Sequence, residues 1–189
     1  LEPSKEARKY GLYHSLIISD AHSLPSVSGH FASALSNSVL EHIPDVQGVL
    51  DEVYRALQDG GVFYFAVPNH RWREKLWGQA IFKCLGLKRL ASAYERFFNK
   101  ISRHVNLDAP EVWIERLKQA GFESVETFNY FPVWALRMLE RGHAAGLPNL
   151  LWKKLFGKWV LFPSRKNPFL RFNKIRKLVD NPKCEDGVC

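Results

Sequence analysis

Polar side chains follow directly after two apolar runs of the chain, and this placement is typical of a ligand-binding crevice. The first polar group covers residues 37–42, NSVLEH, after the apolar run that begins at Phe31. The second covers Pro68 to Arg71, after the run Val62 to Val67. Ligands of open α/β sheets bind beyond the carboxyl ends of the parallel strands. If both runs are strands of one sheet, the two polar groups line one crevice.

The stretch between the two runs predicts a helix that packs on this sheet. Pro44-Asp45 is typical of a helix start, and apolar residues then recur at spacings of three and four from Val46 to Leu57. Residues 59–61, DGG, predict the end of the helix, because glycine adopts the left-handed C-terminal conformation at little cost. Residues 31–68 therefore form a predicted βαβ unit, with a central parallel strand at Val62 to Val67.

Further elements are predicted on both sides of this unit. His14 to Ser19 and Ser124 to Tyr130 have the composition of short strands. Residues 71–103 hold two sets of apolar residues at helical spacing, one from Trp72 to Ile81 and one from Ala91 to Phe98, which predict two helices. A last helix is predicted from Pro110 to Ala120, with Gly121 as its stop.

Length and composition indicate one globular domain. The chain has 189 residues, of which 46% are hydrophobic and 24% charged, so it can bury a core of its own. No apolar run reaches the ~18 residues of a membrane-spanning helix. The three cysteines make no disulfide framework, and no Cys/His cluster has zinc-ligand spacing. These features predict a reducing, cytoplasmic location and no metal site.

The net charge of +8 is distributed unevenly along the chain. Residues 71–103 carry nine Lys/Arg against two Asp/Glu, and residues 151–189 carry ten against three. Residues 1–70 are acidic instead, with four Lys/Arg against eight Asp/Glu. Partner binding is therefore expected in the two basic segments. Their charge favours an anionic substrate or an anionic surface as the partner.

Short motifs in a fixed order resemble the class I S-adenosylmethionine-dependent methyltransferases over about residues 1–130. The motifs are Leu1-Glu2-Pro3-Ser4, Asp20-Ala21, Val39-Leu40-Glu41-His42-Ile43, Gly60-Gly61 before Pro68, and HVNLDAPEVWIERLKQAGF at residues 104–122. No motif is specific by itself. The resemblance rests on all of them occurring in the same order as in the family. It implies an α/β, Rossmann-like three-layer sandwich with a mostly parallel sheet and with lid helices inserted at residues 71–103.

The resemblance also implies which residues bind the cofactor, S-adenosylmethionine. They are Glu2, Pro3, Asp20, Ala21, Asn37, Ser38, Val39 and His42. In the family an acidic residue at the position of Glu2 accepts hydrogen bonds from both ribose hydroxyls, a task for which a carboxylate offers two acceptor oxygens. Asp20 would accept from the adenine amino group, and the Ala21 N–H would meet a ring nitrogen. The alternatives are an exposed terminal Glu2 and an Asp20 that caps a turn.

His104 is the catalytic candidate that the resemblance implies, because a histidine before this helix often reaches the substrate pocket in the family. Its free pKa near neutrality suits a general base, or a group that orients the acceptor. An imidazole that only bonds loop backbone is an equal alternative. For His42, which belongs to a helix-entry motif, a structural role is favoured.

One family feature is missing from the sequence. The glycine-rich loop after the first strand, which lets backbone approach the methionine part of the cofactor, has no counterpart here. The chain also opens inside the Leu1-Glu2-Pro3 motif, so we expect a fold that is truncated at its N-terminus. A methyltransferase-like binding module without activity is the alternative.

The C-terminal part is expected to meet the methyl acceptor or a membrane. We divide the chain into a core at residues 1–130, a basic amphipathic extension at 131–180 that includes the last strand in one alternative, and a disordered end at 181–189. Leu151 to Val160 places tryptophan and lysine on opposite faces, which is typical of an interfacial helix. The expected acceptor is therefore a small molecule or a lipid-linked one at an anionic membrane, to which the protein binds peripherally. A soluble metabolite is the alternative, and nucleic acid is not expected because no RNA-binding module is recognisable.

Overall fold

The computed structural model describes residues 7–145 and 187–189. Glu2, Pro3 and the amphipathic stretch from Leu151 lie outside these residues. Residues 7–9 are helical. The elements that follow are β1 (Phe31–Asn37), a 3-10 turn η1 (Leu40–His42), α2 (Val46–Ala56), β2 (Leu57–Ala66), a 3-10 turn η2 (His70–Trp72), α3 (Trp77–Cys84), α4 (Lys88–Ser102), α5 (Pro110–Ala120) and α6 (Val133–Ala145).

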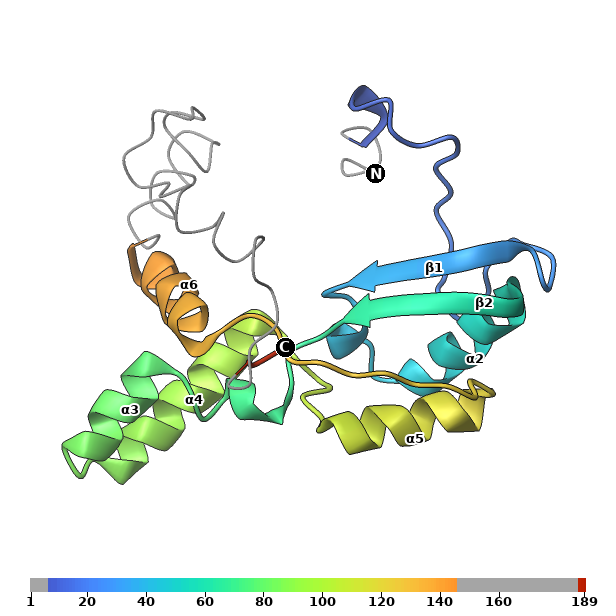
Figure 1. Ribbon diagram of the computed structural model, residues 1–189. Helices are drawn as coiled ribbons and strands as arrows, with labels where there is room; N and C mark the ends of the chain where they lie inside the picture. The colour runs from blue at the N-terminus through green and yellow to red at the C-terminus, as the bar shows by residue number, and fades with distance from the viewer. Residues whose placement is uncertain (1–6, 146–186) are drawn as a thin grey trace.

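β1 and β2 pair in parallel, as the βαβ prediction requires, and Figure 1 shows both arrows pointing the same way. The register is regular from Ser33, opposite Val62, to Asn37, opposite Ala66. An irregularity precedes it, where the backbone of Gly60 has a φ of +72°. The predicted helix stop at residues 59–61 is therefore wrong. α2 already ends at Ala56, and the two glycines form the bulged start of β2.

α2 and α5 cover one face of the sheet, below it in Figure 1. Asp45 caps α2, because its side chain accepts a hydrogen bond from the N–H of Gly48. The core between these layers consists of Leu40, Val46, Val49, Leu50, Trp113 and Leu117, with Phe63 and Phe65 of β2 packed against it. We call β1, β2, α2 and α5 the sheet unit.

The other face of the sheet is open among the described residues. Leu35 of β1 is 80% exposed, and Val62 and Tyr64 of β2 are also exposed. β2 alternates between exposed and partly buried residues, so it does not have the two buried faces expected of a central strand. The reason is that no described helix lies on that face of the sheet (Figure 1).

The two helices predicted for residues 71–103 are present as α3 and α4, which form a hairpin that turns at Gly86. We call this pair the lid hairpin. Trp72, expected in the first helix, lies in η2 instead. A second core, separate from that of the sheet unit, joins the hairpin to α6 through Trp72, Leu76, Phe98, Leu107, Leu136 and Val188. We call α3, α4, α6 and residues 187–189 the helical unit.

Two predicted strands are not formed. Residues 14–19 have no strand partner among residues 7–145 and 187–189, and Ile17 and Ile18 are exposed there. Residues 124–129 have none either, and only Tyr130 makes a bridge, through two backbone hydrogen bonds with Cys189. Strand composition is not enough, because a strand also requires a neighbour whose backbone continues the ladder.

The end of the chain is packed rather than disordered at its last three residues. Val188 is fully buried, and its carbonyl accepts a hydrogen bond from the Asn69 N–H at 2.9 Å. For residues 187–189 the expectation of a disordered end is therefore wrong. The division of the chain into core, extension and tail otherwise stays a prediction.

No helix within residues 7–145 and 187–189 is both long enough and apolar enough to cross a bilayer.

Candidate functional site

The candidate site lies where the chain leaves β1. Ser38 has a φ of +53°, and its N–H donates to the Ala66 carbonyl at 2.9 Å, so the backbone turns sharply beside the end of β2. η1 follows, and two of its residues differ in exposure. Glu41 is 2% exposed, whereas His42 remains largely accessible. The turn thus places one buried carboxylate and one accessible imidazole at the carboxyl end of the sheet.

Residues 103–106, which we call the histidine loop, are fixed against η1 by hydrogen bonds. The N–H groups of Val105 and Asn106 both donate to the Glu41 carbonyl, at 2.7 and 3.0 Å. The Asn106 side-chain amide donates to the carbonyls of Leu40 and Ile43, at 3.0 and 2.7 Å. These bonds satisfy backbone groups of both segments, so His104 is held beside η1 by the fold itself.

The His104 imidazole lies between two rings. It stacks on His42 with 5.4 Å between the ring centroids, and the Trp72 ring meets it edge-on at the same separation. Burial, together with the nearby His42 and Arg73, lowers the pKa of His104 to about 4. The ring is therefore neutral at physiological pH, and so low a pKa favours the orienting role over that of a general base.

Asp20 and His22 form the second part of the site. Oδ1 of Asp20 accepts from the His22 backbone N–H at 3.0 Å and lies 2.8 Å from Nδ1 of the same residue. These hydrogen bonds from His22 lower the pKa of Asp20, and the hydrogen bond to Asp20 raises the pKa of His22. Nε2 of His22 lies 2.9 Å from the Asp45 carbonyl, which ties the pair to the start of α2.

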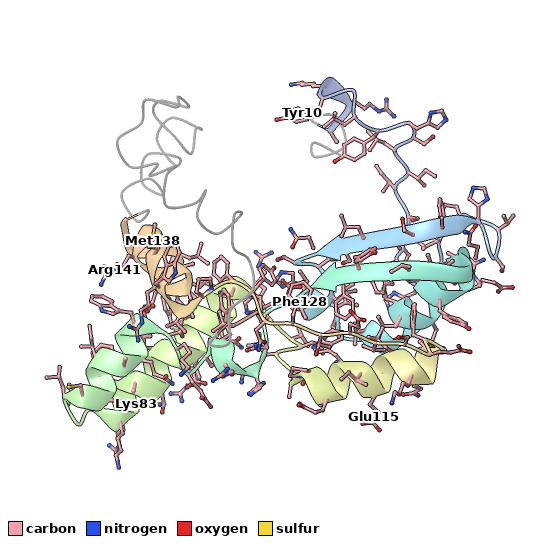
Figure 2. All side chains as sticks on the ribbon, viewed as in Figure 1. Tyr10, Lys83, Glu115, Phe128, Met138 and Arg141 are labelled. Carbon is pink, nitrogen blue, oxygen red and sulfur yellow. The ribbon has the colours of Figure 1, made fainter. Side chains whose placement is uncertain are left out.

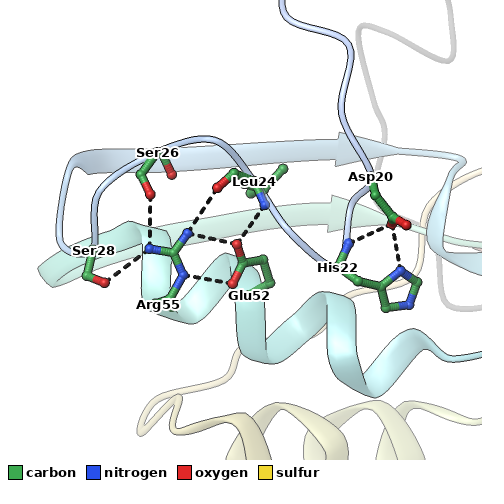
Figure 3. A network of polar contacts seen from close by, with 7 residues as sticks. All are labelled: Asp20, His22, Leu24, Ser26, Ser28, Glu52 and Arg55. Carbon is green, nitrogen blue, oxygen red and sulfur yellow. Dashed lines mark hydrogen bonds and ion pairs between the residues drawn. The ribbon is translucent and has the colours of Figure 1, made fainter.

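The predicted cofactor residues that the structure describes lie near one edge. Figure 3 shows Asp20 and His22 toward the carboxyl ends of β1 and β2, and Asn37, Ser38 and Val39 leave β1 at the same end. Ala21 packs against the core of the sheet unit.

Pro68 and Asn69, expected to line the crevice, are buried instead. The Asn69 amide donates to the Gly187 carbonyl at 3.3 Å, so this segment supports the end of the chain.

Glu52 and Arg55, two positions within the predicted βαβ unit, form a structural network at the other end of α2 (Figure 3). Both nitrogens Nε and Nη2 of Arg55 donate to the Glu52 carboxylate at 2.7 Å. Nη1 of Arg55 also donates to the Ser26 carbonyl and the Ser28 hydroxyl, and Glu52 accepts from the Leu24 N–H. The bidentate pair therefore fixes the segment before β1 onto α2.

Two carboxylates in important places were missed in the sequence. Glu41 lies between residues that were singled out, but nothing in a single sequence signals its burial. Glu140 of α6 is buried and accepts hydrogen bonds from the N–H groups of Trp77 and Gly78, at 2.5 and 2.8 Å. It therefore caps α3 from a distant segment. A sequence predicts only caps that come from residues next to the helix start, so this cap could not be foreseen.

Comparison with known proteins identifies a family. Residues 2–127 match the model of a family described as methyltransferase domain. None of the curated proteins matches the chain.

Two solved structures resemble part of the chain. One is an S-adenosylmethionine-dependent methyltransferase of Thermotoga maritima, described as a possible histamine N-methyltransferase. It is 22% identical, with a TM-score of 0.48, over 64% of this chain and 51% of that one. The other is a methyltransferase of Haloferax volcanii in complex with the Trm112 methyltransferase activator. It is 19% identical, with a TM-score of 0.48, over 65% of this chain and 47% of that one.

This chain thus spans about half the length of those structures. The family match covers well over half of the sequence and includes β1, α2, β2, the lid hairpin and α5. It agrees with the parallel α/β arrangement predicted from the motifs. The chain therefore belongs to the methyltransferase-domain family.

Proposed function

We propose that this protein transfers a methyl group from S-adenosylmethionine to a lipid-linked or small-molecule acceptor at an anionic membrane surface. The observation that carries the membrane part is the lid hairpin, which projects away from the sheet unit in Figure 1. Its outer end presents apolar side chains that no described residue covers. Leu85, on one side of the Gly86 turn, is 65% exposed, and Leu87 and Leu90 are exposed on the other side.

Cations surround this apolar end. Lys83 lies on α3, toward the outer end of the hairpin (Figure 2), and Lys88 and Arg89 begin α4. A shallow hollow of about 370 Å³ on α4 is lined by Lys88, Arg89, Ser92 and Arg96. Apolar tips between basic side chains are typical of proteins that bind in the interface of a membrane. Each cation near an anionic surface contributes about 1 kcal/mol of attraction, and salt weakens this contribution.

The residues around Asp20 fit the adenine end of the cofactor. Within residues 7–145 and 187–189, Oδ2 of Asp20 accepts no hydrogen bond and the Ala21 N–H donates none. A free carboxylate oxygen beside a free N–H complements an amino group beside a ring nitrogen. Glu2 and Pro3 are proposed for the ribose, Asn37, Ser38, Val39 and His42 for the rest of the cofactor, and His104 for orienting the acceptor.

When bound, the cofactor supplies an electrophilic methyl group for in-line attack by the acceptor. The protein then has to align the two molecules and exclude water, which requires no catalytic triad. The cofactor assignment is tested by Asp20→Ala, with Glu115→Ala, at an exposed carboxylate of α5, as the control that leaves the site unchanged. Loss of a charge-assisted hydrogen bond predicts at least about a tenfold weaker affinity for S-adenosylmethionine by calorimetry. Equal affinities of the parent and Asp20→Ala would contradict the assignment.

Vesicle co-sedimentation tests the membrane assignment. We expect the protein to sediment with vesicles of phosphatidylcholine and phosphatidylserine, and less with phosphatidylcholine alone. Exchanging Leu85 and Leu87 for serine removes the apolar tip without changing the charge, so binding should fall by about tenfold or more at every salt concentration. Exchanging Lys88 and Arg89 for glutamine should weaken binding at low salt and matter little at high salt.

Two matched controls are available in the sheet unit and before it. Leu12→Ser changes a leucine before β1 that is more exposed than either tip leucine, and Lys118→Gln changes an exposed lysine of α5. Both variants should bind vesicles as the parent does. If they lose as much binding as the hairpin variants, the membrane assignment is wrong. Methyl transfer to a soluble acceptor then becomes the better proposal. If the cofactor also fails to bind, the better proposal is a binding module without activity.

A further inference from the structure

Three metal-ligating side chains from two distant segments meet beside the end of β1. Glu41 and His42 belong to η1, and His104 belongs to the histidine loop. Each offers one ligand atom, and these three atoms lie within 4.8 Å of one another. Nε2 of His42 is 3.7 Å from Oε1 of Glu41, close to the separation of about 3.3–3.7 Å between two ligands of one tetrahedral zinc ion.

Two polar atoms of this cluster are buried without a hydrogen-bond partner. They are Oε2 of Glu41 and Nδ1 of His104. The Glu41 side chain is almost completely buried, and an uncompensated buried carboxylate is costly. A cation between these atoms would compensate the carboxylate and use the lone pair of the imidazole.

The His42 ring is oriented as in a metal ligand. Its Nδ1 lies 2.9 Å from the Arg103 carbonyl, and a carbonyl only accepts, so Nδ1 carries the proton. The lone pair therefore lies on Nε2, the nitrogen that approaches Glu41. Metal-bound histidines typically donate their other N–H to a carbonyl or carboxylate in this way.

The backbone holds the cluster together. The hydrogen bonds from Val105 and Asn106 to η1 fix the two segments independently of any ligand. A ligand set on a fixed backbone loses little conformational entropy when it binds an ion.

We propose that Glu41, His42 and His104 bind a divalent transition-metal cation. Two imidazoles and one carboxylate are a ligand set typical of Zn²⁺, with a fourth position left for an oxygen ligand. His42 is 40% exposed, so this position faces solvent. The sequence predicted no metal site, because the ligands come from positions without zinc-ligand spacing. His42 and His104 are also proposed above for the cofactor and the acceptor, but metal binding is measured without activity, so the two proposals can fail independently.

The test is metal binding by the whole chain after treatment with a chelator. Competition of Zn²⁺ with a chromophoric indicator should give one equivalent bound, and Co²⁺ should give the visible absorption of a tetrahedral site. We expect Zn²⁺ binding to weaken by about 100-fold in each of the variants His42→Ala, His104→Ala and Glu41→Gln. Loss of a residue that only supports a ligand weakens metal binding by about 10- to 100-fold, and loss of the ligand itself should cost at least the upper value.

The control is His30→Ala, which removes an exposed histidine just before β1, at the opposite end of the strand. It should bind Zn²⁺ as the parent does. Circular dichroism identifies any variant that fails to fold, and Glu41→Gln, which keeps the side-chain volume, then decides. No stoichiometric binding by the parent, or equal binding by the parent and a folded ligand variant, overturns the proposal. Ordered water would then be the partner of the two buried atoms.

Discussion

The sheet unit and the helical unit are held together in different ways. In the sheet unit and the loops beside it, polar contacts hold several segments: Asp45 caps α2, the Glu52–Arg55 pair fixes the segment before β1 onto α2, and Asn106 holds the histidine loop against η1. In the helical unit one buried carboxylate, Glu140, accepts three hydrogen bonds from two helices. Three polar contacts of the helical unit thus converge on one residue, whereas those of the sheet unit are spread over several.

Charge separates the two units as well. Residues 71–103 are strongly basic, whereas residues 1–70 are acidic. Figure 2 labels two exposed side chains of opposite charge, Lys83 on the lid hairpin and Glu115 on α5. The excess of basic side chains in residues 71–103 therefore lies on the lid hairpin and the segment that leads into it.

The largest effects are expected from the two cores. Leu50→Ala in the sheet unit and Leu136→Ala in the helical unit each remove a fully buried side chain and should each lower the free energy of unfolding by about 2–5 kcal/mol. Hydrogen exchange should show increased exchange confined to the unit that carries the substitution. Increased exchange spread equally over both units would show that the two cores form one cooperative unit.

Glu140 should give the next largest effect. Glu140→Ala leaves the N–H groups of Trp77 and Gly78 and the Tyr94 hydroxyl without their acceptor, which should cost about 3 kcal/mol. Hydrogen exchange of the α3 amides and urea unfolding measure this loss of stability. Glu74→Ala, at an exposed carboxylate just before α3, is the control and should change stability little.

The Glu52–Arg55 pair predicts a pH dependence of the sheet unit. The hydrogen bond from Arg55, together with that from the Leu24 N–H, lowers the pKa of Glu52 to about 2. Because the folded-state pKa is depressed, the pair stabilises fully above the unfolded pKa and loses its contribution as the pH falls from about 4.5 to about 2. The Tm difference between the parent and Glu52→Gln should therefore narrow over this range. A difference that stays constant would show that Glu52 is not ionised through this pair.

The smallest effect is expected at the Asp108–Arg116 ion pair. Its atoms are 2.8 Å apart, but both side chains are partly exposed to solvent. Asp108→Asn should change the free energy of unfolding by less than about 1 kcal/mol, and less still at high salt. A larger loss would mean that Asp108 also supports the start of α5.

The helices could be predicted well because each carries its own signal. The apolar spacing of α2, the glycines after α3 and α5, and Pro110 at the start of α5 are local features, and the structure confirms them. α6 was not predicted as a helix, and its buried residues Ala135 and Leu136 face a core made by distant segments.

The strands and the site were predicted less well, for a related reason. Residues 14–19 and 124–130 have strand composition. Whether they form strands depends on neighbouring strands that the local sequence does not specify. The crevice prediction placed Asn37 to His42 beyond the carboxyl end of the first strand, and the structure has them at that end of β1. It did not include His104, which only the resemblance implied for the pocket, because the contact of His104 with η1 depends on Asn106 reaching two carbonyls of η1.

The position of α4 has a mechanical consequence. This helix of 15 residues runs from Lys88, next to the apolar tip, to Ser102, directly before the histidine loop. At 1.5 Å per residue it is a stiff rod about 22 Å long, so a tilt of about 5° at the tip displaces its far end by about 2 Å. The helix is thus a continuous, stiff connection between the outer end of the hairpin and the histidine loop.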